Sequence, residues 1–168
     1  DDLCSYLVSL DSYMRASYIG IVLNPPTSPL QEEYILQSLG DRSLDVRNKA
    51  YKVLSEMALS PEQNQKVEEL LRFKYSEMRI NAINLLMKQP KEELAGSIRR
   101  LLTDKVAERR LAGLDMMKTI HNVDFMQDIY QELLPAIKEI QKPNAKEKVL
   151  IESLIGDGTE KKATQHYT

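Results

Sequence analysis

Side chains that commonly perform chemistry are sparse in this sequence. It contains two histidines, His121 and His166, and one cysteine, Cys4. Metal-dependent catalysis on helices needs histidine and carboxylate side chains at helical spacing, as in HExxH, and that spacing does not occur. Glycine-rich phosphate loops and the Gly-x-Ser-x-Gly nucleophile motif are also missing from the sequence. We therefore expect a chain that is not an enzyme and has no cofactor or metal site, with Cys4 as a small apolar core residue.

Phosphate binding is the other chemistry to consider, because it needs only clustered cations. Arg42, Arg72, Lys74 and Lys105 fall where turns between helices are expected. The formal net charge is −2, so the chain as a whole has no field that attracts polyanions. Binding of DNA or RNA through the basic turns therefore stays an alternative hypothesis.

Composition indicates a globular chain in a reducing compartment. Of the 168 residues, 42% are apolar and 29% are charged, which is typical of folded domains that can bury a core. A single cysteine cannot form an internal disulfide, and no stretch approaches the roughly 18 apolar residues of a membrane span. The sequence opens with Asp1 and Asp2, without an initiator methionine or a signal peptide. We expect a cytoplasmic segment of a longer protein that does not contact a membrane.

Three markers recur at intervals of roughly 30 residues, a period typical of stacked helix pairs. One is Arg-x-x-Ala, another is a proline where a helix should begin, and the last is a leucine that ends the first helix of each pair. In chain order the markers are Arg47, Arg79 and Arg109 with Ala50, Ala82 and Ala112; Pro29, Pro61 and Pro90; and Leu39, Leu71 and Leu101.

These markers and the apolar periodicity predict three helix pairs over residues 29–120. Ser28 and Ser60 precede two of the prolines and are expected N-caps. The first helices are predicted at 29–39, 61–71 and 90–102, and the second helices at 44–58, 76–88 and 105–119.

The flanking segments complete one continuous domain from about residue 3 to 156. Residues 1–28 are expected to hold a helix or partial repeat and a proline-rich linker. Residues 121–156 are expected to form a capping helix pair, with helices at 123–141 and 146–155 and a kink near Pro135. Residues 157–168 are expected to form a polar, poorly ordered tail.

The stretch LGDRSLDVRNKAYKVL, residues 39–54, resembles the short HEAT-like repeat of bilin-lyase-like bacterial proteins. Those repeats have a leucine, a Gly-Asp turn and Val-Arg-x-x-Ala, which here are Leu39, Gly40, Asp41, Val46, Arg47 and Ala50. LLTDKVAERRLAGLDMM, residues 101–117, is more weakly similar to repeat segments of large bacterial proteins that resemble molybdate-metabolism regulators. The tetratricopeptide signature does not recur.

The resemblance implies an all-α fold, a right-handed α-α superhelix of the armadillo/HEAT-like solenoid type. It also implies that Arg47, Arg79 and Arg109 are structural and bond to turn groups. In such arrays the second helices line the concave face, so a scaffold that binds a protein partner there is our first hypothesis, and a structural spacer is a further alternative. The candidate partner face comprises Asn48, Lys52, Asn84, Lys88, Arg110 and Lys118.

Overall fold

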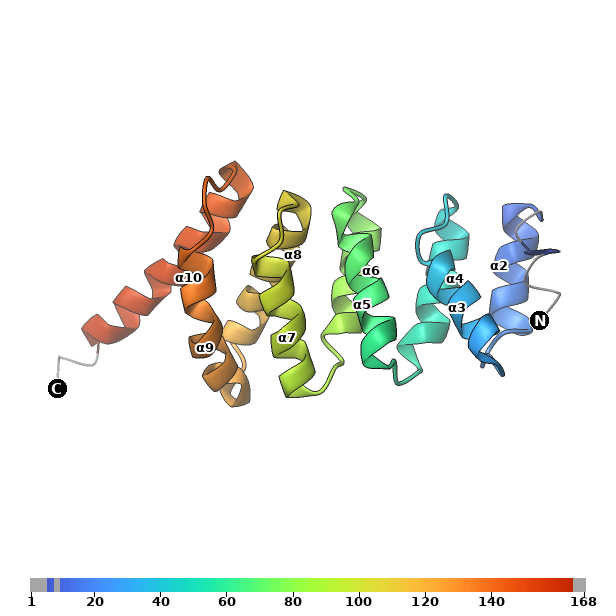
Figure 1. Cartoon of the computed structure of the whole chain (residues 1–168), viewed down its shortest axis with the longest axis horizontal. Helices are drawn as coiled ribbons and strands as arrows, with labels where there is room; N and C mark the ends of the chain where they lie inside the picture. The colour runs from blue at the N-terminus through green and yellow to red at the C-terminus, as the bar shows by residue number, and fades with distance from the viewer. Residues whose placement is uncertain (1–5, 8–9, 165–168) are drawn as a thin grey trace. The chain divides into compact units, whose positions relative to one another are not determined.

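The computed structural model describes residues 6–7 and 10–164, and within these residues the chain is helical, with no strand (Figure 1). The all-α prediction is thereby confirmed. The α-helices are α2 (Ser12–Ile21), α3 (Pro29–Ser38), α4 (Leu44–Ser55), α5 (Pro61–Glu69), α6 (Ser76–Leu86), α7 (Lys91–Leu102), α8 (Ala107–His121), α9 (Gln127–Lys138) and α10 (Ala145–Thr164), and the short 3-10 helices are η1 (Leu70–Arg72) and η2 (Asp124–Met126).

Two helices begin at the serine-proline pairs as predicted. Ser28 accepts a hydrogen bond from the Gln31 amide at 3.2 Å, and Ser60 accepts one from the Gln63 amide at 3.2 Å. The Gln63 side chain accepts from the Ser60 amide at 2.9 Å, which completes a capping box. These bonds satisfy backbone donors that have no partner within the helix. The third pair differs, because Pro90 is itself the N-cap of α7 and provides no side-chain bond.

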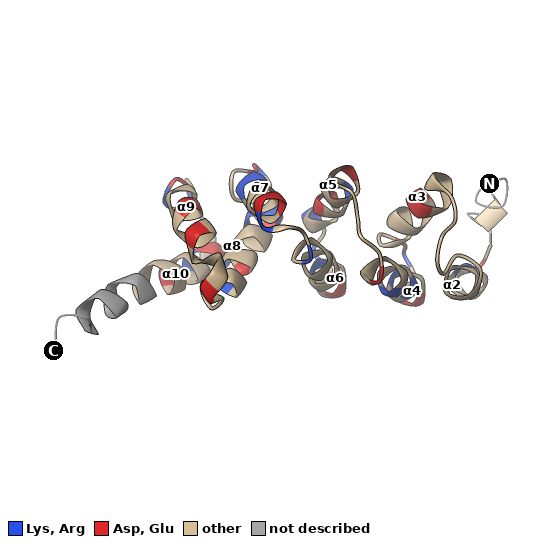
Figure 2. Cartoon of the chain, turned by 90° about the horizontal axis from the view of Figure 1, so that it is seen from below, with Lys and Arg blue, Asp and Glu red and all other residues tan. Residues whose placement is uncertain are grey.

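The chain divides into two compact units, unit 1 (Asp1–Leu85) and unit 2 (Leu86–Thr168). The division falls at the end of α6, inside the region that the sequence predicts as three helix pairs. Unit 1 places α3 and α5 in one row and α2, α4 and α6 in another, and unit 2 places α7 and α9 in one row and α8 and α10 in another (Figure 2).

Unit 1 is held together by apolar contacts between its helices, both within and between the two rows. Helix α4 packs against α2 and α3, and α3 also contacts α5. Burying each large aliphatic side chain contributes about 1.5–3 kcal/mol. The buried side chains of α4 and α6 include the small residues Ala50 and Ala82. The core includes Ala16, Ile19, Ile35, Leu36, Val46, Ala50, Val53, Leu54, Val67, Leu71, Met78 and Ala82.

In unit 2, α8 is the central element and contacts α7, α9 and α10. It lies close to α7 at Gly113, where an added Cβ would lie 3.1 Å from the backbone nitrogen of Leu102 and 3.2 Å from Cβ of Leu101. The core around α8 includes Leu94, Ile98, Leu101, Leu111, Ala112, Leu114, Met117, Ile120, Leu133 and Ile137.

The C-terminal part of the chain departs from the predicted elements. At residues 123–141, η2 precedes α9, and Pro135 lies within α9. Helix α10 continues to Thr164, past the expected end at residue 155 and into the segment expected to be a polar tail. Gly156 and Gly158 do not end the helix, since glycine costs helical backbone only about 1 kcal/mol relative to alanine.

Candidate functional site

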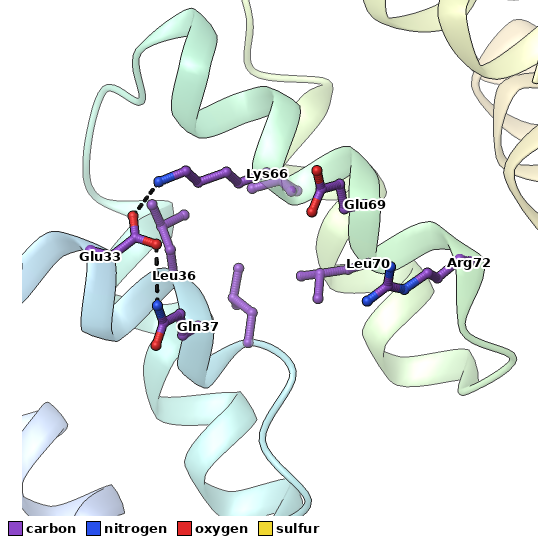
Figure 3. A pocket seen from close by; sticks show the side chains of 9 residues that line it. Glu33, Leu36, Gln37, Lys66, Glu69, Leu70 and Arg72 are labelled. Atoms are coloured by element: carbon purple, nitrogen blue, oxygen red, sulfur yellow. Dashed lines mark hydrogen bonds and ion pairs between the residues drawn. The ribbon is translucent and has the colours of Figure 1, made fainter. Parts of the chain in front are cut away.

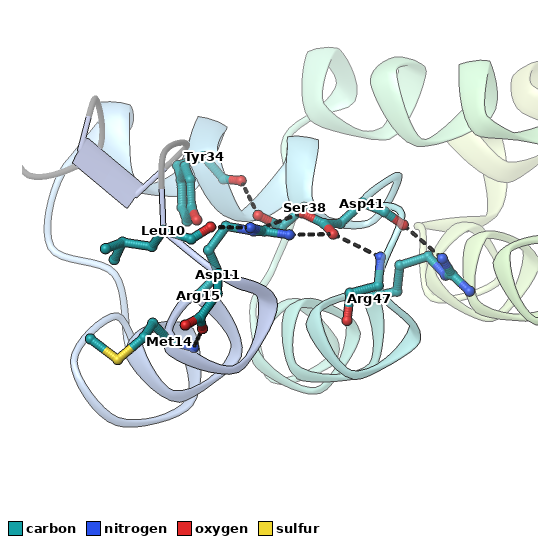
Figure 4. Close-up of polar contacts among 9 residues, drawn as sticks. Leu10, Asp11, Met14, Arg15, Tyr34, Ser38, Asp41 and Arg47 are labelled. Carbon is teal, nitrogen blue, oxygen red and sulfur yellow. Dashed lines mark hydrogen bonds and ion pairs between the residues drawn. The ribbon is translucent and has the colours of Figure 1, made fainter.

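An arginine on α2 fixes the turn between α3 and α4. Nε and Nη2 of Arg15 donate to the two carboxylate oxygens of Asp41 at 3.1 and 3.0 Å, and Nη1 donates to the Leu10 carbonyl (Figure 4). Asp41 also accepts from the Ser43 amide at 2.8 Å. Arg15 is 5% exposed. A two-bond pairing of this kind is both strong and directional, so Arg15 sets the position of the turn.

Burial pushes the pKa of Asp41 upward, yet the hydrogen bonds from Arg15 and Ser43 and the positive charge of Arg15 together outweigh it. The net result is a pKa for Asp41 below its ordinary value. The pKa of Arg15 is raised, chiefly by the hydrogen bond to Asp41. Both groups are therefore charged at neutral pH, which identifies the pair as a permanent structural bridge.

Arg47 links the same turn to the next second helix. Its Nη1 donates to the Asp41 carbonyl at 2.7 Å, and its Nη2 pairs with the Glu77 carboxylate on α6. Arg47 is 8% exposed. The turn contact implied by the repeat resemblance is present, and the bond to α6 extends it to the next helix pair.

The turn before α8 in unit 2 has the same arrangement of bonds. The arginine that makes them is one residue further along the chain than the Arg-x-x-Ala alignment predicts. Asp104 accepts from the Val106 amide at 2.8 Å, as Asp41 accepts from Ser43. Nη1 of Arg110 donates to the Asp104 carbonyl at 3.0 Å, and Nε of Arg110 donates to Glu147 on α10 at 2.6 Å. Arg110, and not Arg109, therefore occupies the position that Arg47 has in unit 1.

Because Arg110 replaces Arg109 in this alignment, the small residue three positions later is Gly113 and not Ala112. Gly113 follows Arg110 by three residues, as Ala50 follows Arg47, and Gly113 lies at a close contact with α7. Arg109 instead donates to the Asp104 carboxylate at 2.7 Å, and Ala112 is buried beside Gly113. In unit 1, Arg79 is half-buried and Ala82 is buried.

Five of the six residues predicted for the partner face are exposed. Arg110 differs from the prediction, because its bonds to Glu147 and to turn carbonyls hold it in the fold. In unit 1, Asn84 donates to the hydroxyl of Tyr51 at 3.4 Å, which connects α6 to α4. The other members are exposed: Asn48, Lys52 and Asn84 in unit 1, and Lys88 and Lys118 in unit 2.

A groove of about 290 Å³ separates α3 from α5 on the other row of unit 1 (Figure 3). Glu33 on its rim accepts bonds from Lys66 and from Gln37, the latter at 3.3 Å. The hydrogen bond from Lys66 is the main cause of the lowered pKa of Glu33. The remaining lining residues are Leu36, Leu39, Val67, Glu69, Leu70 and Arg72. An apolar floor with a charged rim can receive a side chain of a polypeptide.

The basic turn residues Arg42, Arg72, Lys74 and Lys105 are all exposed. In unit 1 two aromatic residues accompany them. Phe73 is 36% exposed and Tyr75 is 62% exposed, so basic and aromatic side chains alternate along residues 72–75. The letters RFKY carry this signal, but our sequence reasoning treated the segment only as a turn with basic residues and did not consider Phe73 and Tyr75.

Of the candidate chemical residues, His121 packs its ring against Tyr130 with centroids 4.6 Å apart. Cys4 and His166 lie outside the described residues. Among residues 6–7 and 10–164, no group of three or more His, Cys, Asp or Glu side chains is arranged to hold a metal ion. No helix in this part of the chain has the length and apolarity to cross a membrane.

Comparison with known proteins places the chain in a family. No curated protein and no solved structure matches it. A family model described as a family of unknown function (DUF5724) matches residues 1–167, nearly the whole sequence. The chain therefore belongs to the DUF5724 family.

Proposed function

We propose that this chain is a non-catalytic HEAT-like interaction module of a larger cytoplasmic bacterial protein, and that it binds a protein partner. In this proposal the helix pairs form a right-handed superhelix and their second helices line its concave face. The recurrence of the markers and the shared turn geometry of Asp41 and Asp104 support a repeat origin. A crystal structure in which Arg47 and Arg110 lie at non-equivalent positions of the first and third helix pairs would contradict the superhelix.

The observation that carries the proposal is the exposed polar side of α4 and α6 in unit 1. The opposite side of these helices is committed to the core through Ala50 and Ala82. The exposed side presents Lys52 and the amides of Asn48 and Asn84. Amides both donate and accept hydrogen bonds, so such a surface can bind peptide groups of a partner.

Photo-crosslinking tests this face directly. We would replace Asn48 by a photoreactive phenylalanine analogue, irradiate cells that express the chain, and identify the covalent adducts by mass spectrometry. The same adduct should decrease strongly when Lys52→Glu and Asn84→Glu are added, because two new negative charges oppose the partner surface. Both substituted residues are exposed, so the fold should be preserved.

A matched control reverses charge on the other helix row. Glu69→Lys changes the rim of the α3–α5 groove and should leave the Asn48 adduct unchanged. If Glu69→Lys removes the adduct and the face variant does not, the partner binds in the groove and the face assignment is wrong. Replacement of the chain by a length-matched linker tests the spacer alternative, which predicts that the function of the parent protein survives.

A further inference from the structure

We propose that the turn edge of unit 1 binds single-stranded nucleic acid. The turn edge is defined as Arg42, which follows α3, and the four residues after Leu71, namely Arg72, Phe73, Lys74 and Tyr75. All five side chains are exposed.

The two turns that form this edge are neighbours in the fold. A Cβ at Gly40 would lie 3.3 Å from the Leu70 side chain, so the turn before α4 contacts η1. Arg47 bonds to the Asp41 carbonyl, and its guanidinium lies 6.0 Å from the ring centroid of Tyr75. The turn that carries Arg42 therefore lies beside the segment that carries residues 72–75.

Two of the carboxylates that neighbour the turn edge in the sequence are already paired with arginines. Asp41 is held by Arg15, and Glu77 is held by Arg47. Asp45 and Glu69 are exposed close by in the sequence and reduce the local field. The three cations of the turn edge thus exceed the two exposed acidic residues by one charge. This small excess favours binding of nucleic acid that is weak and sensitive to salt.

The aromatic residues distinguish a single strand from other anions. Phe73 and Tyr75 alternate with the basic residues, and the guanidinium of Arg72 lies 5.0 Å from the centre of the Phe73 ring. A single strand likewise alternates phosphates with unpaired bases, and bases stack on exposed aromatic rings without strong sequence preference. Duplex bases are already stacked on one another, so a duplex would gain only the charge contacts.

Fluorescence anisotropy of the whole chain with a labelled oligothymidine of about 12 nucleotides tests this proposal. We expect saturable binding at about 50 mM NaCl, a loss of affinity at about 200 mM, and weaker binding of a duplex of equal charge. Tyr75→Leu should weaken binding about tenfold, whereas Tyr75→Phe keeps the ring and should bind normally.

A second pair of variants separates local charge from total charge. Lys74→Ala should lower the slope of log affinity against log salt by about one, while Lys138→Ala, at an exposed position in the last turn of α9, removes the same charge and should leave that slope unchanged. Equal affinity for the duplex, equal effects of Tyr75→Leu and Tyr75→Phe, or competition by poly-glutamate at equal charge would each overturn the proposal. The absence of binding at about 50 mM NaCl would also overturn it.

Discussion

Arg110 and Glu147 form a buried ion pair that joins α8 to α10. Nε of Arg110 lies 2.6 Å from Oε1 of Glu147, and the Glu147 side chain is completely buried. Glu147 also accepts from the Asn144 amide at 2.8 Å, while the Asn144 side chain accepts from the Glu147 amide at 2.9 Å. One carboxylate therefore caps α10 and attaches it to α8.

Glu147→Gln should destabilise the protein by about 3 kcal/mol, because the guanidinium of Arg110 would lose its buried counter-charge. The amide oxygen can still cap α10, so the loss reports mainly on the ion pair. Urea unfolding monitored by circular dichroism measures the effect. Glu139→Gln, at an exposed position of unit 2, is the control and should change stability by less than about 0.5 kcal/mol. Equal stability of the two variants would show that the pair contributes nothing.

Gly113→Val should destabilise the protein by about 1–3 kcal/mol, because the added carbons would press against the backbone and side chain of Leu102. Gly96→Ala is the matched control in the same unit. Its added methyl would meet only the end of the Arg100 side chain at 3.4 Å, so it should stabilise α7 by about 0.5–1 kcal/mol. Thermal unfolding of both variants gives the comparison, and a stable Gly113→Val protein would contradict the close contact.

Ser60→Ala should cost about 1 kcal/mol, because it removes the side-chain acceptor of the α5 capping box. Ser43 is the N-cap of α4 but makes no side-chain capping bond. Ser43→Ala should therefore cost clearly less than Ser60→Ala in the same denaturant titration. The reverse order would mean that the capping bonds do not determine the stability of these helix starts.

Asp41 should contribute an acid-dependent part of the stability. Its pKa in the folded protein is lowered, so the contribution is present above the unfolded-state pKa and is lost as the pH falls through the lower folded-state pKa. The ordinary pKa of an aspartate side chain is 3.8. Wild type should consequently lose more unfolding free energy than Asp41→Asn when the pH falls from neutral to below that value. Parallel pH profiles of the two proteins would exclude this contribution.

Local signals in the sequence identified most helix starts and the alternation of helices. Ser28 with Pro29 and Ser60 with Pro61 act through bonds within a few residues, so their structural effect can be read from the letters alone. The buried alanines Ala50, Ala82 and Ala112 also followed from helical spacing. The cationic turns were visible as well, although their aromatic neighbours were overlooked.

Contacts between distant segments were decided only by the tertiary structure. The sequence aligned Arg109 with Arg47, but Arg110 makes the equivalent bonds because its side chain reaches a carboxylate 37 residues away. Nothing in the local pattern around Glu147 or Asp41 indicates which arginine will be its partner. Capping and periodicity depend on near neighbours in the chain, whereas ion pairing and the fit at Gly113 depend on how helices meet in space, which no short stretch of sequence encodes.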